Sequence, residues 1–171
     1  AIALYRPGPM DSIPKYIENS RNREKIEYPD ERLRDILGVT YGCIVYQEQV
    51  MQIFRELAGY TYGRADIVRR AMSKKKQDVM ENERQVFLYG TPDGNIEGAI
   101  KRGVDKKTAL QIFDDMADFA KYAFNKSHAS AYSYLTYQTA YLKCYYPAEY
   151  MASLISLSLD DEDKINSYVA E

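Results

Sequence analysis

The amino-acid sequence predicts a mainly α-helical, irregular multi-helix domain with few or no strands. Apolar residues recur at the three- and four-residue spacing of amphipathic helices in several long stretches, and this periodicity is the primary signal for a helix. Strand-like alternation of apolar and polar residues persists nowhere, and no internal repeat is present. Glycine and proline separate the periodic stretches, so they mark where helices end.

The composition is that of one globular domain. The 171 residues are 46% hydrophobic and 28% charged, with a net charge of −2, so affinity for nucleic acid must come from a local basic patch. We find no signal peptide and no apolar run long enough to span a bilayer. Cys43 and Cys144 follow no metal-binding spacing, and one histidine cannot complete a zinc site with them. We therefore expect two buried free thiols in a reducing cytosol.

The N-terminal part predicts turns and short helices. Residues 3–14 contain three prolines and a glycine, which exclude a continuous helix, and the proline that follows Arg6 holds this residue extended. Residues 15–28 are charged, and we expect them to be exposed. Residues 29–37 are predicted to form a short helix, with Gly38 as its C-cap.

Residues 44–58 form the clearest predicted helix. Apolar side chains occupy one arc, and the opposite arc carries Glu48, Gln49, Gln52, Arg55 and Glu56. Gln47 is the exception, because it falls inside the apolar arc. A buried amide must find partners, so Gln47 either braces a neighbouring loop or faces a ligand cavity.

The most basic stretch is residues 59–76, GYTYGRADIVRRAMSKKK. On a helix of about 100° per residue, one arc is apolar. It contains Ala65, Ile67, Val68, Ala71 and Met72, and the other arc contains Arg69, Arg70, Lys74 and Lys76. Lys75 would return to the apolar arc, so we expect the helix to bend, fray or end near Ser73.

Two interpretations of the basic stretch are open. Adjacent arginines on a packed helix can grip separate oxygens of a polyphosphate, because guanidinium groups are always charged and bond bidentately. Alternatively, Asp66, three and four residues before Arg69 and Arg70, pairs with both, and the lysines form a solvated face.

The next segments predict helices separated by turns. Residues 77–88 form a polar helix that the sequence GTPDG breaks, and residues 96–101 form a brief helix. Asp105 is the N-cap of a core helix at residues 106–124. Its apolar arc contains Ala109, Ile112, Phe113, Met116, Ala117, Phe119, Ala120, Ala123 and Phe124. Asp114, Asp115 and Asp118 lie on its solvated side, where no second acidic cluster completes a metal site.

The C-terminal part predicts two further helices and a last capped segment. The sequence NKSH at residues 125–128 interrupts the helical pattern, and open amides at a helix start favour anions. A helix rich in tyrosine begins at Ser130. One face, which we expect to be mostly core, combines Tyr134, Leu135, Tyr137, Gln138, Tyr141, Leu142 and Tyr145. Pro147 starts a helix over residues 148–157, and the acidic residues 160–163 cap a last segment.

Catalytic machinery is not visible in the sequence. No strained nucleophile turn surrounds Ser127 or Ser130, although His128 lies between them, so a hydrolase is not indicated. The pattern GxxxxGK[ST] of a Walker loop does not occur. The chain therefore shows phosphate-binding potential without catalytic or metal-binding residues.

Several stretches together resemble one family in order and approximate spacing. They are ALYRPGPM, YGCIVYQEQVMQI, LAGYTYGRADIVRRAMSKKK, FNKSHASAYSYLTYQTAYLK and YPAEYMASL. These stretches are similar to the fingers region of the C-family polymerase III alpha subunit, the bacterial replicative DNA polymerase. The resemblance covers residues 3–158, and residues 160–171 are a less distinctive continuation. The sequence departs from the family at Ser73, where the family usually has glycine.

The resemblance implies that residues 1–171 are the fingers domain of a larger cytoplasmic bacterial polymerase. Residues 1–14 would come from the palm side, and residues 159–171 would lead toward the following domain. The parent would be a DNA-directed DNA polymerase, a nucleotidyltransferase of DNA replication, whereas the fragment alone would be inactive. The palm would hold the catalytic Mg²⁺. The implied partners are a deoxynucleoside triphosphate, template-primer DNA, the other domains of the parent and replisome subunits such as the sliding clamp, but no membrane.

The resemblance also implies roles for individual residues. The nucleotide-binding candidates are Arg69, Arg70, Lys74, Asn125, Lys126 and His128. Those for nucleic acid are Arg64, Lys75 and Lys76, with Arg6 and Gln47 as secondary candidates, and His128 or a lysine would protonate the leaving group. The alternatives are a non-catalytic helical module that binds nucleic acid or protein through the basic stretch, and a structural spacer. Dependence on a matched triphosphate discriminates a polymerase from a simple binder.

Overall fold

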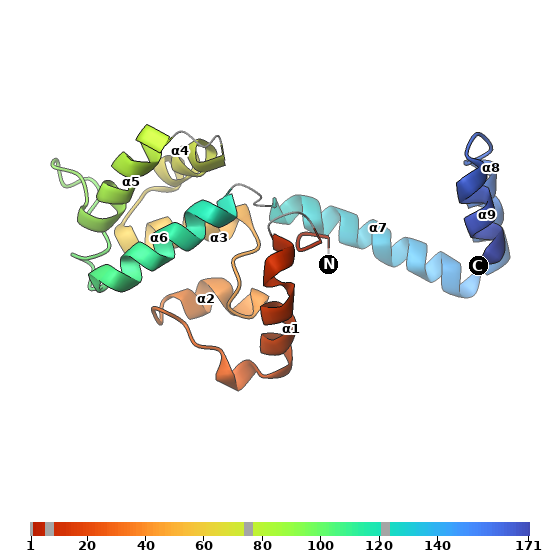
Figure 1. The fold of residues 1–171 in the computed structure, drawn as a ribbon, viewed down its shortest axis with the longest axis horizontal. Helices are drawn as coiled ribbons and strands as arrows, with labels where there is room; N and C mark the ends of the chain where they lie inside the picture. The colour runs from red at the N-terminus through yellow and green to blue at the C-terminus, as the bar shows by residue number, and fades with distance from the viewer. Residues whose placement is uncertain (1, 6–8, 74–76, 121–123) are drawn as a thin grey trace. The chain divides into compact units, whose positions relative to one another are not determined.

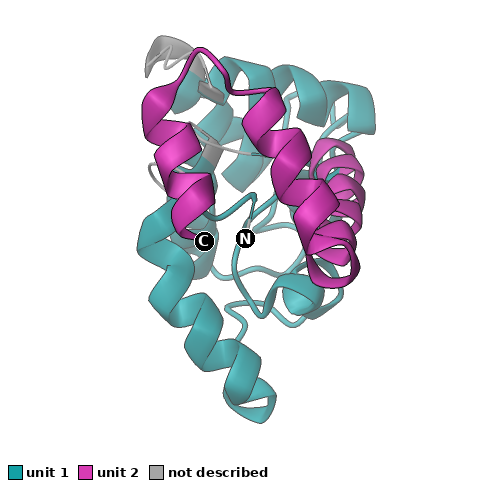
Figure 2. Cartoon of the chain, turned by 90° about the vertical axis from the view of Figure 1, so that its right-hand side faces the viewer, with its two compact units in different colours: residues 1–126 teal, residues 127–171 magenta. Residues whose placement is uncertain are grey.

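The computed structural model describes residues 2–5, 9–73, 77–120 and 124–171. In this described part the chain forms α-helices and short 3-10 helices but no β-strand, which confirms the predicted mainly α-helical fold. The chain divides into two compact units, residues 1–126 and residues 127–171 (Figure 2). No described helix combines the length and the apolar character that crossing a bilayer requires.

Short helices make up the N-terminal part of the first unit, as its prolines predict (Figure 1). They are η1 (Pro9–Ser12), α1 (Ile13–Arg21), η2 (Arg23–Lys25), α2 (Leu33–Leu37) and η3 (Gly38–Thr40). Gly38 is the C-cap of α2, as predicted, with a right-handed φ of −58°, and the chain continues from it into η3. The left-handed turn comes at Tyr41 and Gly42, where the N–H of Gly42 bonds to the carbonyl of Leu37 at 3.0 Å.

Helix α3 (Gln47–Ala58) contains a buried amide, but this amide belongs to Gln49 and not to Gln47. The Oε1 of Gln49 accepts from the N–H groups of Val45 at 2.8 Å and Tyr46 at 2.9 Å. Its Nε2 donates to the carbonyl of Ile36 at 3.1 Å and to Thr40 Oγ1 at 2.7 Å. Tyr46 is extended, so the helix starts later than predicted and Gln49 fastens this extended segment to α2 and η3.

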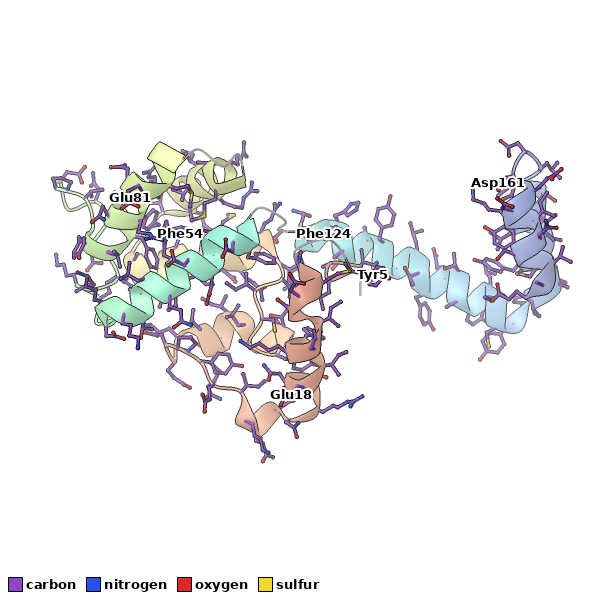
Figure 3. The ribbon with its side chains drawn as sticks, in the orientation of Figure 1. Tyr5, Glu18, Phe54, Glu81, Phe124 and Asp161 are labelled. Atoms are coloured by element: carbon purple, nitrogen blue, oxygen red, sulfur yellow. The ribbon has the colours of Figure 1, made fainter. Side chains whose placement is uncertain are left out.

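Three helices complete the first unit and pack with α3 around its core (Figure 1). They are α4 (Tyr62–Ser73), α5 (Gln77–Tyr89) and α6 (Lys106–Ala120). Phe54, Phe87 and Phe113, from α3, α5 and α6, are fully buried, with ring centroids 5.4 to 6.2 Å apart, and Phe54 lies among these helices in Figure 3. Helix α4 is described to Ser73, and the predicted bend or end of the helix beyond it falls on residues 74–76, outside the described residues. The helix buries Ala65, Val68 and Met72. Ile67 departs from the predicted apolar arc, because 60% of its surface is exposed.

The predicted helix at residues 96–101 is wrong, because this segment forms turns. The N–H of Ala99 bonds to the carbonyl of Phe87 at 2.7 Å, so the end of α5 takes a donor that a helix would use internally. Gly90 and Gly98 make the close approach possible. Both have positive φ, and a Cβ at Gly98 would lie 2.4 Å from the nitrogen of Gly90. Asp105 caps α6 as predicted, since its carboxylate accepts from the N–H of Lys107 at 2.9 Å.

The second unit contains most of α7 (Lys126–Tyr145), with α8 (Pro147–Ser156) and α9 (Glu162–Ala170). Helix α7 begins four residues before the predicted Ser130, so Lys126, Ser127 and His128 form its first turn. Pro147 opens α8 and Asp161 caps α9 through the N–H of Lys164 at 3.1 Å, as the proline and the acidic stretch predict.

The expectation that the tyrosine face of α7 is core is wrong for this chain. Tyr134, Tyr137, Tyr141 and Tyr145 are 45 to 70% exposed, because α8 and α9 pack on each other and leave this face of the long helix uncovered within the unit. Cys144 on the same helix is also exposed, whereas Cys43 is buried as expected. Both thiols are free.

The hydrogen bonds of Gln49 predict the effect of removing its amide. Gln49→Leu keeps a similar volume but leaves the buried N–H of Val45 and the partly buried N–H of Tyr46 without their acceptor. We expect the free energy of unfolding of the chain to fall by about 2 to 4 kcal/mol, measured by urea denaturation. Gln85→Leu, which changes an exposed amide on α5, is the matched control. Equal, small effects of both changes would contradict the assigned role of Gln49.

Candidate anion-binding site

The two adjacent arginines of the basic stretch meet at one carboxylate. Asp66 Oδ1 accepts from Nε of Arg69 at 3.1 Å and from its Nη2 at 2.8 Å, and Asp66 Oδ2 lies 2.7 Å from Nη2 of Arg70. The predicted pairing of Asp66 with both arginines is therefore confirmed. The arginines differ in exposure, because 14% of the Arg69 side chain is accessible and 68% of that of Arg70.

The ion pairs affect the titration of Asp66. The hydrogen bonds from Arg69 are the largest influence, and with those from Arg70 they outweigh the opposing effect of burial and lower the pKa of Asp66. The carboxylate therefore stays charged into acid. Pairing with Asp66 and binding of an anion are compatible, because each guanidinium group carries five N–H donors.

Arg64, the third described cation of α4, pairs with a buried carboxylate. Its Nη2 lies 2.5 Å from Oε2 of Glu83 on α5, and the other oxygen of Glu83 accepts from the hydroxyl of Tyr60 at 2.7 Å. Glu83 and Tyr60 are each 2% exposed. Burial and then the Glu83 carboxylate raise the pKa of Tyr60 above its ordinary range. The ion pair between Arg64 and Glu83 therefore holds α4 against α5. Contact of Arg64 with nucleic acid stays a prediction.

A second group of predicted residues comes together where α3 and α7 begin. Glu48 of α3 accepts from Nδ2 of Asn125 and from the N–H of Lys126, in each case at 3.1 Å. The N–H of Gln47 donates to the carbonyl of Phe124 at 2.9 Å, and Figure 3 shows Phe124 beside the start of α7. The Glu48 carboxylate thus interacts with the helix start at which the sequence predicts an anion.

The remaining predicted residues divide into described and undescribed ones. His128 lies in the first turn of α7, and its ring is 4.4 Å from that of Tyr132. Arg6, Lys74, Lys75 and Lys76 lie outside the described residues.

Sequence reasoning missed two carboxylates that hold the predicted cations and polar groups. Glu83 gave a signal, because it shares the helical face of Met80 and Phe87 on α5 and so falls inside an apolar arc. Glu48 gave none, since its partners are 77 and 78 residues away in the sequence.

A cleft of about 650 Å³ in the first unit lies apart from these groups. Its lining combines apolar residues of α2 and α6 with Asp11, Lys15, Glu27, Asp115 and Asp118, and includes no described residue of the predicted nucleotide site. Burial raises the pKa of Asp115. Among the residues that the structure describes, no three His, Cys, Asp or Glu side chains are grouped as around a metal ion.

Comparison with known proteins relates the chain to one family. Residues 1–95 match the family model of the bacterial DNA polymerase III alpha subunit finger domain. The chain is 52% identical over 169 residues to the DNA polymerase III subunit alpha of Treponema pallidum (strain Nichols). It is 46% identical to the proteins of the same name from Thermus aquaticus, over 175 residues, and Escherichia coli (strain K12), over 177 residues. Each match covers 99% of this chain and 14 or 15% of the relative, so the chain spans about a seventh of their length.

The buried ion pair of Arg64 predicts a large loss of stability when this arginine is removed. Arg64→Met leaves Glu83 buried with Tyr60 as its remaining described partner, so we expect the free energy of unfolding to fall by about 3 kcal/mol. Urea denaturation measures this loss. Arg34→Met is the matched control, because Arg34 pairs with Glu31 at the exposed surface, where solvent screens the pair, so its removal should cost much less. Similar losses for both variants would contradict a structural role for the Arg64 pair.

The lowered pKa of Asp66 predicts a pH-dependent contribution to stability. Its ion pairs stabilise the fold fully above the ordinary aspartate pKa of about 4, and this stabilisation is lost as the pH falls through the lower folded-state pKa. Wild type should therefore exceed Asp66→Asn in free energy of unfolding at pH 7, and the difference should shrink below about pH 4. Urea denaturation of both proteins at a series of pH values measures this difference. The other carboxylates titrate in both proteins, so their effects cancel in the difference. A constant difference would be inconsistent with charge pairing.

Proposed function

The chain belongs to the bacterial DNA polymerase III alpha subunit finger domain family, and from this membership we propose that it binds the incoming deoxynucleoside triphosphate and helps to hold template-primer DNA. The parent protein would be a DNA-directed DNA polymerase, and thus a nucleotidyltransferase, of DNA replication in the bacterial cytoplasm. The main support for the nucleotide role is the pair of Arg69 and Arg70, two guanidinium groups directed to one carboxylate on a packed helix.

Phosphoryl transfer requires what such a pair supplies. The reaction depends on positioning the triphosphate and on neutralising the charge that develops on the departing pyrophosphate. Arg69 is mostly buried, so its guanidinium is held in place, whereas the exposed Arg70 can reach a ligand in solvent. Arg70 would bind oxygens of the triphosphate directly, and Arg69 would fix the geometry and add positive charge.

The group at the start of α7 has a supporting role in this proposal. Glu48 orients Asn125 and the first amide of α7, so Asn125, Lys126 and His128 would approach the nucleotide from a second helix. Lys74 would add to the field of the arginines, and His128 or a lysine would protonate pyrophosphate. Lys75, Lys76 and Arg64 would contact nucleic acid, with Arg6 and Gln47 as secondary candidates.

The remaining parts of the active enzyme would lie outside this chain. Catalytic Mg²⁺ would be bound by the palm of the parent polypeptide, and the roles proposed for α4 do not depend on it. Contact with other domains, and with replisome subunits such as the sliding clamp, would also occur through the parent. Cations carried on a mobile helical domain complete a site only when the domain closes, which would couple nucleotide selection to chemistry.

The test is single-nucleotide incorporation by the full-length polymerase at varied triphosphate concentration. We expect Arg69→Ala and Arg70→Ala each to reduce transition-state stabilisation by about 2 to 4 kcal/mol, because a cation on the transferring phosphates is lost. Arg34→Ala, which removes an exposed arginine paired on α2, is the control and should leave kcat/KM unchanged.

The same variants separate the proposed function from its alternative. A simple nucleic-acid-binding module would lose salt-dependent DNA affinity in the arginine variants without any change in triphosphate dependence. Unchanged incorporation kinetics with intact folding would place the triphosphate elsewhere and leave α4 as a DNA-tracking or structural helix.

A further inference from the structure

The guanidinium groups of Arg69 and Arg70 meet at one carboxylate, although the two side chains leave the helix in different directions. Successive residues of an α-helix point about 100° apart, so two neighbouring arginines have no intrinsic reason to meet. Asp66 precedes them by three and four residues, the spacings that place side chains on one helical face. Its Oδ1 accepts from Arg69 and its Oδ2 lies 2.7 Å from Nη2 of Arg70. The two guanidinium groups are therefore separated by no more than one carboxylate and its hydrogen bonds.

Such convergence has a free-energy cost that Asp66 offsets. Two like charges repel at this separation, and the carboxylate between them reduces the repulsion. Each arginine also has about 2 kcal/mol of rotamer entropy to lose when it is fixed. Where an ion pair fixes the side chain in advance, a ligand does not have to supply this ordering, so binding is tighter. The group of two arginines and one aspartate keeps a net positive charge, so it still attracts an anion.

We propose that Asp66 is a positioning residue, which brings the guanidinium groups of Arg69 and Arg70 together before the triphosphate of an incoming nucleotide arrives. This inference rests on the proposed function, because it assumes that the arginines bind the triphosphate. Asp66 acts through the arginines and does not itself touch the nucleotide. Its removal should weaken triphosphate binding and therefore act on KM more than on kcat.

The opposite role for Asp66 makes a different prediction. If its carboxylate competed with phosphate for the arginines, removing the negative charge would strengthen triphosphate binding. The sign of the change in KM thus decides between preorganisation and competition. A purely local helix-stabilising pair predicts a third result, a change in thermal stability with KM unaltered.

The experiment is steady-state incorporation of one matched nucleotide by the full-length polymerase carrying Asp66→Asn. We expect KM for the triphosphate to rise about tenfold with kcat changed less than about twofold, because ordering of the arginines is lost. Asp66→Glu keeps a carboxylate three and four residues before the arginines, where glutamate also pairs with arginine. Its KM should therefore stay within about twofold of wild type. Glu31→Gln, which removes an i,i+3 pair with Arg34 on α2, is the matched control and should leave KM unchanged.

A double-mutant cycle tests whether Asp66 acts through the arginines. In the Arg70→Ala background, Asp66→Asn should raise KM by clearly less than it does in wild type, because the pair it orders is already broken. Equal effects in both backgrounds would overturn the proposal, as would a lowered or unchanged KM in the single variant, or a Glu variant as impaired as the Asn variant. Thermal unfolding checks that each variant folds. Should Asp66→Asn fail to fold, Asp66→Ser removes the same charge and replaces it in the comparison.

Failure of this inference is distinguishable from failure of the proposed function. If Arg69→Ala and Arg70→Ala leave the triphosphate dependence unaltered, the proposed function is wrong and the inference falls with it. If both arginine variants raise KM while Asp66→Asn does not, the proposed function stands and the positioning role of Asp66 is rejected.

Discussion

The buried carboxylate of Glu83 is the interaction on which the placement of the basic helix depends. A charge at 2% exposure is tolerated only when it is paired and hydrogen-bonded. Tyr60, just after α3, and Arg64, in α4, supply the two partners. Because Glu83 belongs to α5, its side chain links α5 to α4 and to the segment between α3 and α4, and the Tyr60 ring also packs 5.0 Å from Phe54 in the core. Together with the buried Ala65, Val68 and Met72, this ion pair determines which face of α4 is turned toward the core.

Gln49 and Glu48 act in the same way at the other end of α3. Gln49 turns inward and bonds to the backbone on both sides of the turn at Tyr41, so the chain before α3 has a fixed path. Glu48, the preceding residue, points to Asn125 and the first amide of α7. Glu48 and Gln49 thus bond to different segments, because successive side chains on a helix differ in direction by about 100°. Two polar side chains of α3 therefore join it to segments far from it in the sequence.

The sequence predicted what local patterns determine and failed where distant partners decide. The Asp105 cap and the pairing of Asp66 with two arginines both follow from spacing within a few residues. Spacing does not show whether Gln47 or Gln49 is the buried amide. The partners of Gln49 lie in the extended segment before α3 and in η3, at Thr40. The predicted helix at residues 96–101 does not form for a related reason, since the N–H groups of Ala99 and Ile100 bond to carbonyls of α5. The tyrosines of α7 have helical periodicity, but periodicity alone does not say which surface covers them.

The internal carboxylates also decide where an anion gains most from binding. In the group on α4, one aspartate faces two arginines, so a net positive charge remains. At the start of α7, the carboxylate of Glu48 already accepts from the backbone N–H of Lys126, so a second anion there would be repelled by this carboxylate. Arg64 has its charge matched by Glu83. Under the proposed function, we therefore expect the group on α4 to attract a polyphosphate more strongly than the other two described groups do.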